Sequence, residues 1–245
     1  MQVLNRDEII KLSVTTISLP LKGKGDREAV DEVKHMKGKC YIVGGGENFG
    51  LTFKKEPGDY VIAADAGYRY LEKAGLEADM VVGDFDSLGT IPDHPNLVKL
   101  NPIKDVTDTW EAVRLGMEKG YSEFHLYACT GGRIDHTMAN IQLLKYLAEK
   151  ESKGYLYDKE SVLTVIKDSS LSFDDTWDGY ISVFSLSDES KGVTIHGLKY
   201  EVNEILLNNS FSLGVSNEFT GNPSEISVQE GCLLVVFPRK HKIKK

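Results

Sequence analysis

The chain has 245 residues, enough for one large domain or two modest ones that each bury a core. Hydrophobic residues make up 41% of the chain and charged residues 27%, a composition that argues against a largely disordered protein. The formal net charge of −8 argues against a nucleic-acid-binding surface, which needs a basic footprint, and is compatible with a cationic or metal-bridged ligand.

The three cysteines, Cys40, Cys129 and Cys232, are far apart in the sequence and lie in apolar stretches. We expect them to be reduced core residues and not a disulfide or zinc framework, which indicates a cytoplasmic location. No apolar run approaches the ~20 residues that span a bilayer, and the first residues lack a signal-peptide core. We therefore expect neither membrane insertion nor export, and a solvated basic tail at 239–245.

Residues 1–38 show weak periodicity and predict no defined element. Regularity begins with the apolar run 40–43, which predicts a strand and leads into three glycines at 44–46. Such glycines can expose backbone amides to a phosphate, but they lack the spacing of a P-loop or of a dinucleotide fingerprint. A second strand is predicted at 60–64, followed by Asp65, which either caps the next helix or contacts a ligand.

The chain is organised around the stretch 80–87. Its apolar start predicts a buried strand, which breaks at Gly83 into Asp84 and Asp86, at the edge where a parallel sheet presents its ligands. Two carboxylates this close repel each other, and a divalent cation carrying phosphate oxygens would reconcile them. The structural alternative is a turn in which each aspartate accepts hydrogen bonds from nearby backbone amides.

A fourth strand is predicted at 97–100, and a helix opens near Thr107. Asp108, followed three residues later by Glu111, resembles a capping box, which is the structural alternative to a ligand role for this aspartate. A fifth strand is predicted at 124–128. The helix after it is expected to carry apolar residues on one side, namely Met138, Ile141, Leu144 and Ala148.

The segment 130–136 joins this fifth strand to its helix and reads Thr-Gly-Gly-Arg-Ile-Asp-His. Its glycine pair, Arg133 and Asp135 place a phosphate-binding fork and a further carboxylate at the same edge of the sheet. Alternation of strands and helices up to about Lys150 predicts an α/β unit with a parallel sheet.

Short apolar runs separated by turn residues follow Lys150 and predict an all-β half. They lie at 155–157, 162–166, 180–186, 193–195, 204–207, 211–215, 225–228 and 233–237. The predicted fold class is an N-terminal Rossmann-like parallel α/β domain followed by a C-terminal β-sandwich domain. The expected divisions are an extension at 1–38, a catalytic domain at 39–170 that binds ATP and magnesium, and a β-sandwich at 171–245 for thiamine binding and dimerisation, the ligands and the dimer being implied by the resemblance given below.

Four aspartates, Asp84, Asp86, Asp108 and Asp135, are expected at one edge of the parallel sheet. One or two Mg²⁺ ions bound to a nucleotide polyphosphate would offset their mutual repulsion, and Arg133 would face the phosphates. This arrangement indicates transfer of a phosphoryl or pyrophosphoryl group, in which positioning and charge neutralisation provide most of the catalysis.

Three motifs at 83–87, 105–108 and 131–136, with Asn140 further along, resemble in order and spacing the motif set of the thiamine pyrophosphokinase family. The resemblance extends from about Val43 to Phe237, with later markers at 197–200 and 216–218. It implies an ATP-binding α/β domain, a β-sandwich, and a homodimer that binds thiamine in a cleft between subunits. The implied reaction moves the β,γ-pyrophosphoryl group of ATP to the hydroxyl of thiamine and yields AMP and thiamine diphosphate.

The resemblance also implies roles for individual residues of this chain. The implied metal ligands are Asp84, Asp86 and Asp108. The implied catalytic residues are these three with Arg133 and Asp135. The implied ATP-binding residues are Asp65, Ser87, Thr107, Thr130, Gly131, Gly132, Arg133 and His136. The implied thiamine-binding residues are Tyr200, Ser216 and Asn217.

This sequence departs from the family pattern at two places. Tyr200 stands where the family often has tryptophan, and its smaller ring can still hold a cationic thiazolium or instead pack as a sheet aromatic. The segment 65–68 reads Asp-Ala-Gly-Tyr where many relatives have Asp-Gly-Gly-Ala-Asn.

The residue that orients or deprotonates the thiamine hydroxyl is expected to be Asp108 or Asp135. His136 is a further candidate for general base, although it could simply orient the loop. Two other functional classes remain open: a DxD-type metal-dependent phosphohydrolase or sugar-nucleotide transferase, and a non-enzymatic nucleotide-sensing dimer.

Overall fold

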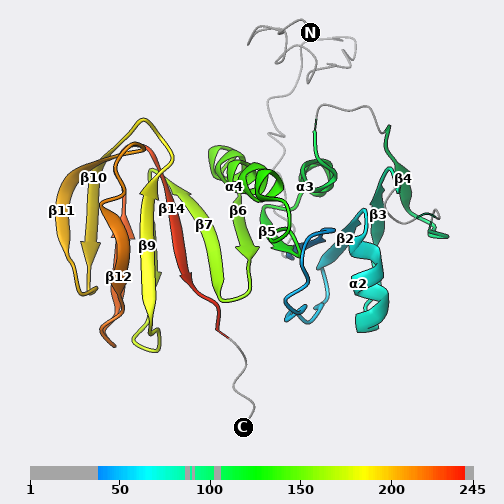
Figure 1. Ribbon diagram of the computed structural model, residues 1–245, viewed down its shortest axis with the longest axis horizontal. Helices are drawn as coiled ribbons and strands as arrows, with labels where there is room; N and C mark the ends of the chain where they lie inside the picture. The colour runs from blue at the N-terminus through cyan, green and yellow to red at the C-terminus, as the bar shows by residue number, and fades with distance from the viewer. Residues whose placement is uncertain (1–37, 86–88, 90–91, 102–105, 241–245) are drawn as a thin grey trace, which may run out of the picture. The chain divides into compact units, whose positions relative to one another are not determined.

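The computed structural model describes residues 38–85, 89, 92–101 and 106–240 (Figure 1). Predictions for residues 1–37, Asp86, Ser87, Asp105 and the tail 241–245 therefore lie outside the described residues. Among the described helices, none is long and apolar enough to cross a membrane.

The first half of the described chain alternates strands and helices, as its apolar runs predict. The elements are β1 (Cys40–Val43), β2 (Tyr60–Ala64), α2 (Gly67–Ala74), β3 (Met80–Gly83), β4 (Leu97–Lys99), α3 (Asp108–Glu118), β5 (Glu123–Tyr127), α4 (Ile134–Glu149) and β6 (Lys153–Tyr157). These strands pair in parallel in the order β6-β5-β1-β2-β3-β4. Helix α2 ends at Gly75, whose positive φ of 66° makes glycine the favoured residue there.

The second half contains only strands. They are β7 (Ser161–Lys167), β8 (Ser170–Phe173), β9 (Tyr180–Ser185), β10 (Glu189–His196), β11 (Val202–Asn208), β12 (Gly214–Glu218), β13 (Ser224–Ser227) and β14 (Cys232–Pro238). A four-stranded antiparallel sheet, β11-β10-β13-β8, packs against β7, β9 and β14 through a shared apolar core. The predicted fold class, α/β followed by a β-sandwich, is confirmed.

The sheet does not stop where the α/β half ends. Strand β7 pairs antiparallel with β6, and β14, β9 and β12 follow, which gives one ten-stranded sheet through both halves. The run 155–157, expected in the all-β half, is β6 and belongs to the parallel part. Strand β8 was not predicted, because its four residues, Ser-Leu-Ser-Phe, carry too short an alternation. The domain boundary at 170/171 stays a prediction.

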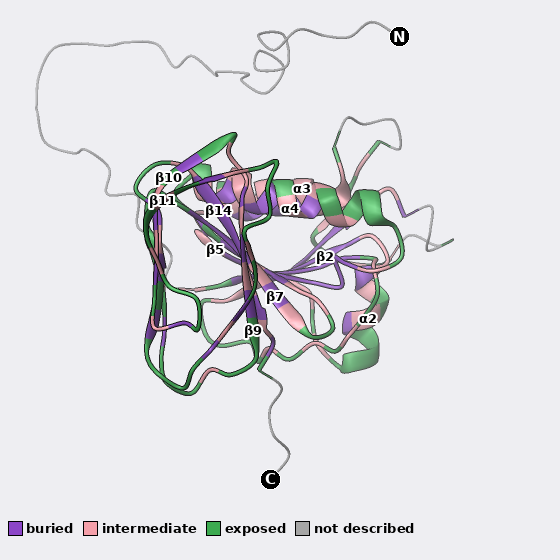
Figure 2. Ribbon diagram, turned by 60° about the vertical axis from the view of Figure 1, so that its left-hand side comes forward, coloured by how far each residue is buried: buried purple, intermediate pink, exposed green. Residues whose placement is uncertain are grey.

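Helices cover the two faces of the parallel part. Helices α3 and α4 bury Val113, Leu144 and Leu147 on one face, and α2 buries Leu71 on the other (Figure 2). The prediction that Met138 shares the buried side of α4 is wrong, since its side chain is 53% exposed while that of Leu144 is 1% exposed. Six residues turn a helix through about 600°, which places Met138 roughly 120° away from Leu144.

The three cysteines are buried and form no disulfide, as expected for core residues. Burial raises the pKa of each thiol, to about 12 for Cys129. These thiols are therefore protonated near neutral pH and act as small apolar side chains.

Candidate nucleotide-binding site

A cavity of about 1000 Å³ lies where strands β2, β3 and β5 end. The parallel register aligns Ala64 with Val82 and, through β1, Ala63 with Tyr127. The residues that follow each strand therefore reach one edge of the sheet, as expected for a parallel α/β fold. Asp65, Asp84 and Asp108 all line this cavity.

Neither Asp65 nor Asp108 is a helix cap, so both capping alternatives are wrong. The N-cap of α2 is Ala66, which makes no side-chain cap hydrogen bond. The N-cap of α3 is Thr107, whose Oγ1 accepts a hydrogen bond from the backbone N–H of Trp110 at 3.1 Å. The carboxylate of Asp108 is therefore not needed to cap the helix on which it stands.

The carboxylates fit a hard divalent cation. Asp84 and Asp108 line the same cavity, and carboxylate oxygens are the ligands that Mg²⁺ prefers. Asp86, the third predicted ligand, lies outside the described residues, and the described part of the chain contains no group of three or more potential ligands that could hold a metal. The magnesium ligand set stays a prediction.

The loop between β5 and α4 forms another wall of the cavity. Thr130, Gly131, Gly132, Arg133 and His136 line it, together with Asn140 from α4. Gly131 and Gly132 have φ angles of 78° and 60°, which favour glycine. Arg133 is the N-cap of the 16-residue helix α4 and makes no side-chain cap hydrogen bond. Backbone amides at such a helix start can receive a phosphate.

Two side chains hold this loop in place. Thr130 donates its hydroxyl hydrogen to Oδ1 of Asp158 at 2.6 Å, and the side-chain amide of Asn140 donates to the carbonyl oxygen of Cys129 at 2.7 Å. Asp158 was not predicted, because it belongs to the turn between β6 and β7 and no local pattern marks its contact with Thr130.

Arg133 and Asp135 form an exposed pair beside the loop. Nε and Nη2 of Arg133 donate to the two carboxylate oxygens of Asp135 at 3.2 and 2.5 Å. The hydrogen bond from Arg133 lowers the pKa of the Asp135 carboxyl group. Asp135 is not among the described residues that line the cavity, whereas Arg133 and His136 are.

The connection between β1 and β2 supplies residues that were not assigned to the site. Gly46 donates its backbone N–H to the carbonyl oxygen of Ala128, and Glu47 donates to that of Thr130. A Cβ atom at residue 46 would lie only 2.5 Å from the Thr130 carbonyl oxygen, so this close approach requires glycine. The three glycines at 44–46 were the sequence signal, but nothing local marked Glu47.

The predicted thiamine-binding residues do not line this cavity and gather in the β half. The side chain of Asn217 accepts a hydrogen bond from the backbone N–H of Tyr200 at 2.9 Å and donates one to its carbonyl oxygen at 2.7 Å. Ser216 donates its backbone N–H to Oγ of Ser182. The ring of Tyr200 is 61% exposed, so the alternative of a packed sheet aromatic is wrong.

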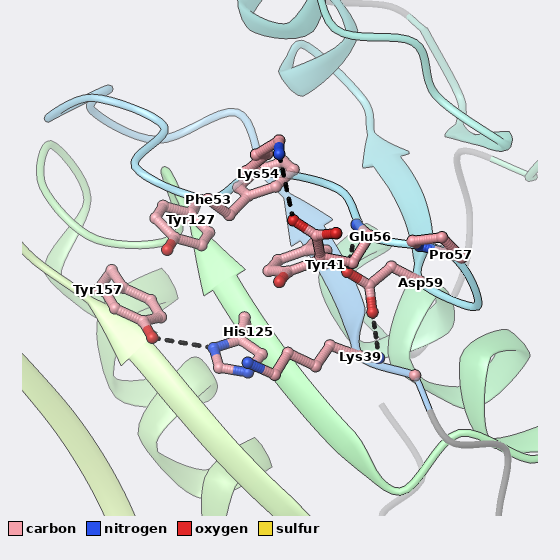
Figure 3. A pocket seen from close by; sticks show the side chains of 11 residues that line it. Lys39, Tyr41, Phe53, Lys54, Glu56, Pro57, Asp59, His125, Tyr127 and Tyr157 are labelled. Carbon is pink, nitrogen blue, oxygen red and sulfur yellow. Dashed lines mark hydrogen bonds and ion pairs between the residues drawn. The ribbon is translucent and has the colours of Figure 1, made fainter.

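A second cavity of about 450 Å³ contains none of the predicted site residues (Figure 3). Its aromatic walls include Tyr41 stacked on Phe53, with ring centroids 4.1 Å apart, and Tyr127 stacked on Tyr157, at 4.3 Å. Nδ1 of His125 and the hydroxyl of Tyr157 are hydrogen-bonded at 2.9 Å. This arrangement packs the sheet face below the β1–β2 connection.

The fold and the first cavity define a class of protein. A parallel α/β sheet whose carboxyl edge combines aspartates, a double-glycine loop and a helix start is typical of enzymes that bind phosphorylated nucleotides. The attached β-sandwich adds a second group of polar and aromatic residues around Tyr200.

Comparison with known proteins identifies the family. The family model "Thiamin pyrophosphokinase, catalytic domain" matches residues 54–156, and "Thiamin pyrophosphokinase, vitamin B1 binding domain" matches residues 168–233. The chain belongs to the thiamine pyrophosphokinase family, which is a family of kinases.

Individual relatives agree with this identification. Thiamine pyrophosphokinase of Bacillus subtilis is 28% identical over 211 residues, which cover 82% of this chain and 98% of the relative. The crystal structure of the Bacillus subtilis enzyme superposes with a TM-score of 0.74 at 26% identity, covering 84% of this chain and 100% of the other. That of Geobacillus thermodenitrificans gives a TM-score of 0.72 at 26% identity, covering 83% and 99%.

Proposed function

We propose that this protein transfers the pyrophosphoryl group of MgATP to the hydroxyl of thiamine, giving thiamine diphosphate and AMP. The observation that carries the proposal is the cavity that brings Asp84, Asp108 and the loop 130–133 together at the carboxyl edge of the sheet. Matches to both domains of the family support the choice of this reaction over hydrolysis or nucleotide sensing.

ATP is proposed to lie along the loop between β5 and α4. The amides of Gly131 and Gly132 and the start of α4 face the cavity and would receive the phosphates, while Arg133 would neutralise their charge. Asp65, at the end of β2, is proposed to bind ATP as well. Thr130, Thr107, Ser87 and His136 complete the proposed ATP-binding set.

Asp84, Asp86 and Asp108 are proposed to hold Mg²⁺. When bound, the ion would bridge phosphate oxygens and offset the charge that develops on the transferring group. Because these aspartates follow different elements of one sheet edge, they would orient the polyphosphate without a change in the fold.

Thiamine is proposed to bind near Tyr200, Ser216 and Asn217. Asn217 is buried and holds the backbone of Tyr200 by two hydrogen bonds, so the exposed ring of Tyr200 is presented on a fixed loop. Such a ring can stack on a cationic heterocycle.

Asp108 is the better candidate to orient or deprotonate the thiamine hydroxyl. Its carboxylate lines the cavity, whereas Asp135 lies against Arg133, and that contact lowers the pKa of Asp135. A lower pKa makes Asp135 a weaker base. We assign Asp135 the role of positioning Arg133.

A homodimer is also proposed. Large apolar side chains are exposed on β9, β11, β12 and the β11–β12 connection, and these elements lie at one end of the β half in Figure 1. They are Tyr180, Leu206, Phe211, Leu213 and Val215. Clusters of this kind mark protein–protein contacts, and β12 is the outer strand of the ten-stranded sheet. The buried, unpaired cysteines support our further proposal of a cytoplasmic location.

Replacing Phe211 by aspartate is expected to shift the protein from dimer to monomer, because a charge would have to be buried in the apolar contact. Size-exclusion chromatography with light scattering measures the change. Met138→Asp introduces the same charge at an exposed apolar side chain of α4 and should leave the dimer intact. A monomeric wild type, or a dimer unaffected by Phe211→Asp, would contradict the proposed interface.

The reaction itself is tested by mass spectrometry of products from ATP, Mg²⁺ and thiamine. We expect AMP and thiamine diphosphate in equal amounts, and no AMP without thiamine. Thiamine monophosphate, whose hydroxyl is blocked, is the matched control and should not be converted. Release of ADP and phosphate without thiamine would indicate a hydrolase, and absence of turnover would indicate a sensor.

A further inference from the structure

The carboxylate of Glu47 lies on the loop proposed to bind phosphate. Its Oε1 accepts a hydrogen bond from the backbone N–H of Gly132 at 3.1 Å, across 85 residues of sequence. Glu47 lines the cavity together with Gly131 and Gly132, and the residue is exposed. An amide at the start of α4 is thus already bound to an anion of the protein itself.

The backbone holds Glu47 at this place. Its own N–H donates to the carbonyl oxygen of Thr130 at 2.9 Å, and the hydroxyl of Tyr70 donates to that of Gly46 at 2.9 Å. Further along the same connection, the buried Arg239 donates from Nη2 to the carbonyl oxygen of Gly50 at 2.7 Å. The backbone is therefore anchored on both sides of Glu47, while the exposed carboxylate can rotate away.

Gly131 is shaped to the same contact. A Cβ atom at residue 131 would lie 2.7 Å from the side-chain carbons of Glu47, and the φ angle of Gly131 is 78°. The turn and the carboxylate therefore fit each other closely in the ligand-free arrangement.

We propose that Glu47 is a specificity-determining residue that occupies the Gly132 amide until a nucleotide phosphate displaces it. The inference rests on the proposed function, because it requires that the loop 130–133 bind phosphate. Carboxylate and phosphate compete for one donor, and their like charges repel. Metal-free ATP carries more negative charge than MgATP, so Glu47 lowers the affinity for metal-free ATP more strongly and favours the magnesium-loaded form.

The test measures nucleotide binding by isothermal titration calorimetry, with ATP in EDTA and with MgATP. Glu47→Gln keeps the shape and one acceptor oxygen but removes the charge. It is expected to lower the Kd for metal-free ATP about fivefold, the difference between a charged and a neutral hydrogen bond, and to change the Kd for MgATP by about twofold or less.

Glu56→Gln is the matched control. It makes the same change in net charge on the same β1–β2 connection, but Glu56 lines the second cavity and forms an ion pair with Lys54 at 3.5 Å. Its affinity for either form of ATP should equal that of the wild type. Adenosine, which has no phosphate, should bind all three proteins alike.

The outcomes separate this inference from the proposed function. If Glu47→Gln binds metal-free ATP no more tightly than the wild type, while the wild type forms AMP from ATP and thiamine, only the role of Glu47 is overturned. If Glu47→Gln weakens MgATP binding about tenfold, Glu47 is a metal ligand and the inference is wrong. A wild type that binds neither form of ATP overturns both proposals.

Discussion

Replacing Asp108 by asparagine is expected to lower kcat for AMP formation about 100- to 1000-fold. Its carboxylate lines the cavity beside Asp84 and is proposed to hold the metal and orient the acceptor hydroxyl. Loss of one preorganised group that stabilises transition-state charge has effects of about this size. Asp84→Asn should give a loss of similar magnitude. Initial rates of AMP formation at saturating ATP, Mg²⁺ and thiamine provide the measurement.

Folding should survive this change. Helix α3 is capped by Thr107 and not by Asp108, so Asp108→Asn is expected to leave the midpoint of thermal unfolding nearly unchanged. Asp93→Asn removes an exposed carboxylate between β3 and β4 that is not among the residues lining either cavity, and it should keep wild-type activity. Full activity in both Asp84→Asn and Asp108→Asn would refute the metal assignment.

Replacing Leu144 by alanine is expected to reduce the free energy of unfolding by about 2–5 kcal/mol. The side chain is 1% exposed and packs between α4 and the sheet, where a Cβ atom on Gly154 of β6 would lie 2.8 Å from its Cδ2. The substitution therefore leaves a cavity that the tightly packed strand cannot easily fill. Urea unfolding followed by circular dichroism measures the loss.

Met138→Ala on the same helix is the matched comparison. Its side chain is 53% exposed, so the free energy of unfolding should change by about 0.5 kcal/mol or less. Equal losses for the two variants would mean that α4 buries both side chains, as its apolar pattern suggested, and would contradict the packing described for this helix.

The α/β half was largely predictable from local pattern. Strands β1, β2, β3 and β5 are short apolar runs that end in glycine or polar residues, and Gly75 ends α2 as expected. Once these strands are parallel, the residues after each of them must meet at one edge. For that reason Asp65, Asp84 and the loop 130–133 could be expected together before any coordinates were known.

Other predictions failed because several tertiary contacts satisfied the same local pattern. The polar residues near the start of α3 could cap it in more than one way, and the structure uses Thr107 instead of Asp108. The aromatic at Tyr200 could pack or face solvent, and the hydrogen bonds from Asn217 present it outward. These outcomes depend on neighbours that local periodicity does not specify.

The sequence by itself determined the type and order of the elements, the acidic edge of the sheet and the resemblance to a family of kinases. Only the tertiary structure decided that one sheet continues from β6 into β7, which face of α4 is buried, and that Glu47 reaches Gly132. The physical reason is range. Apolar periodicity and strand-end residues act within a few positions, whereas strand pairing and contacts across 85 residues are selected by the packing of the whole chain.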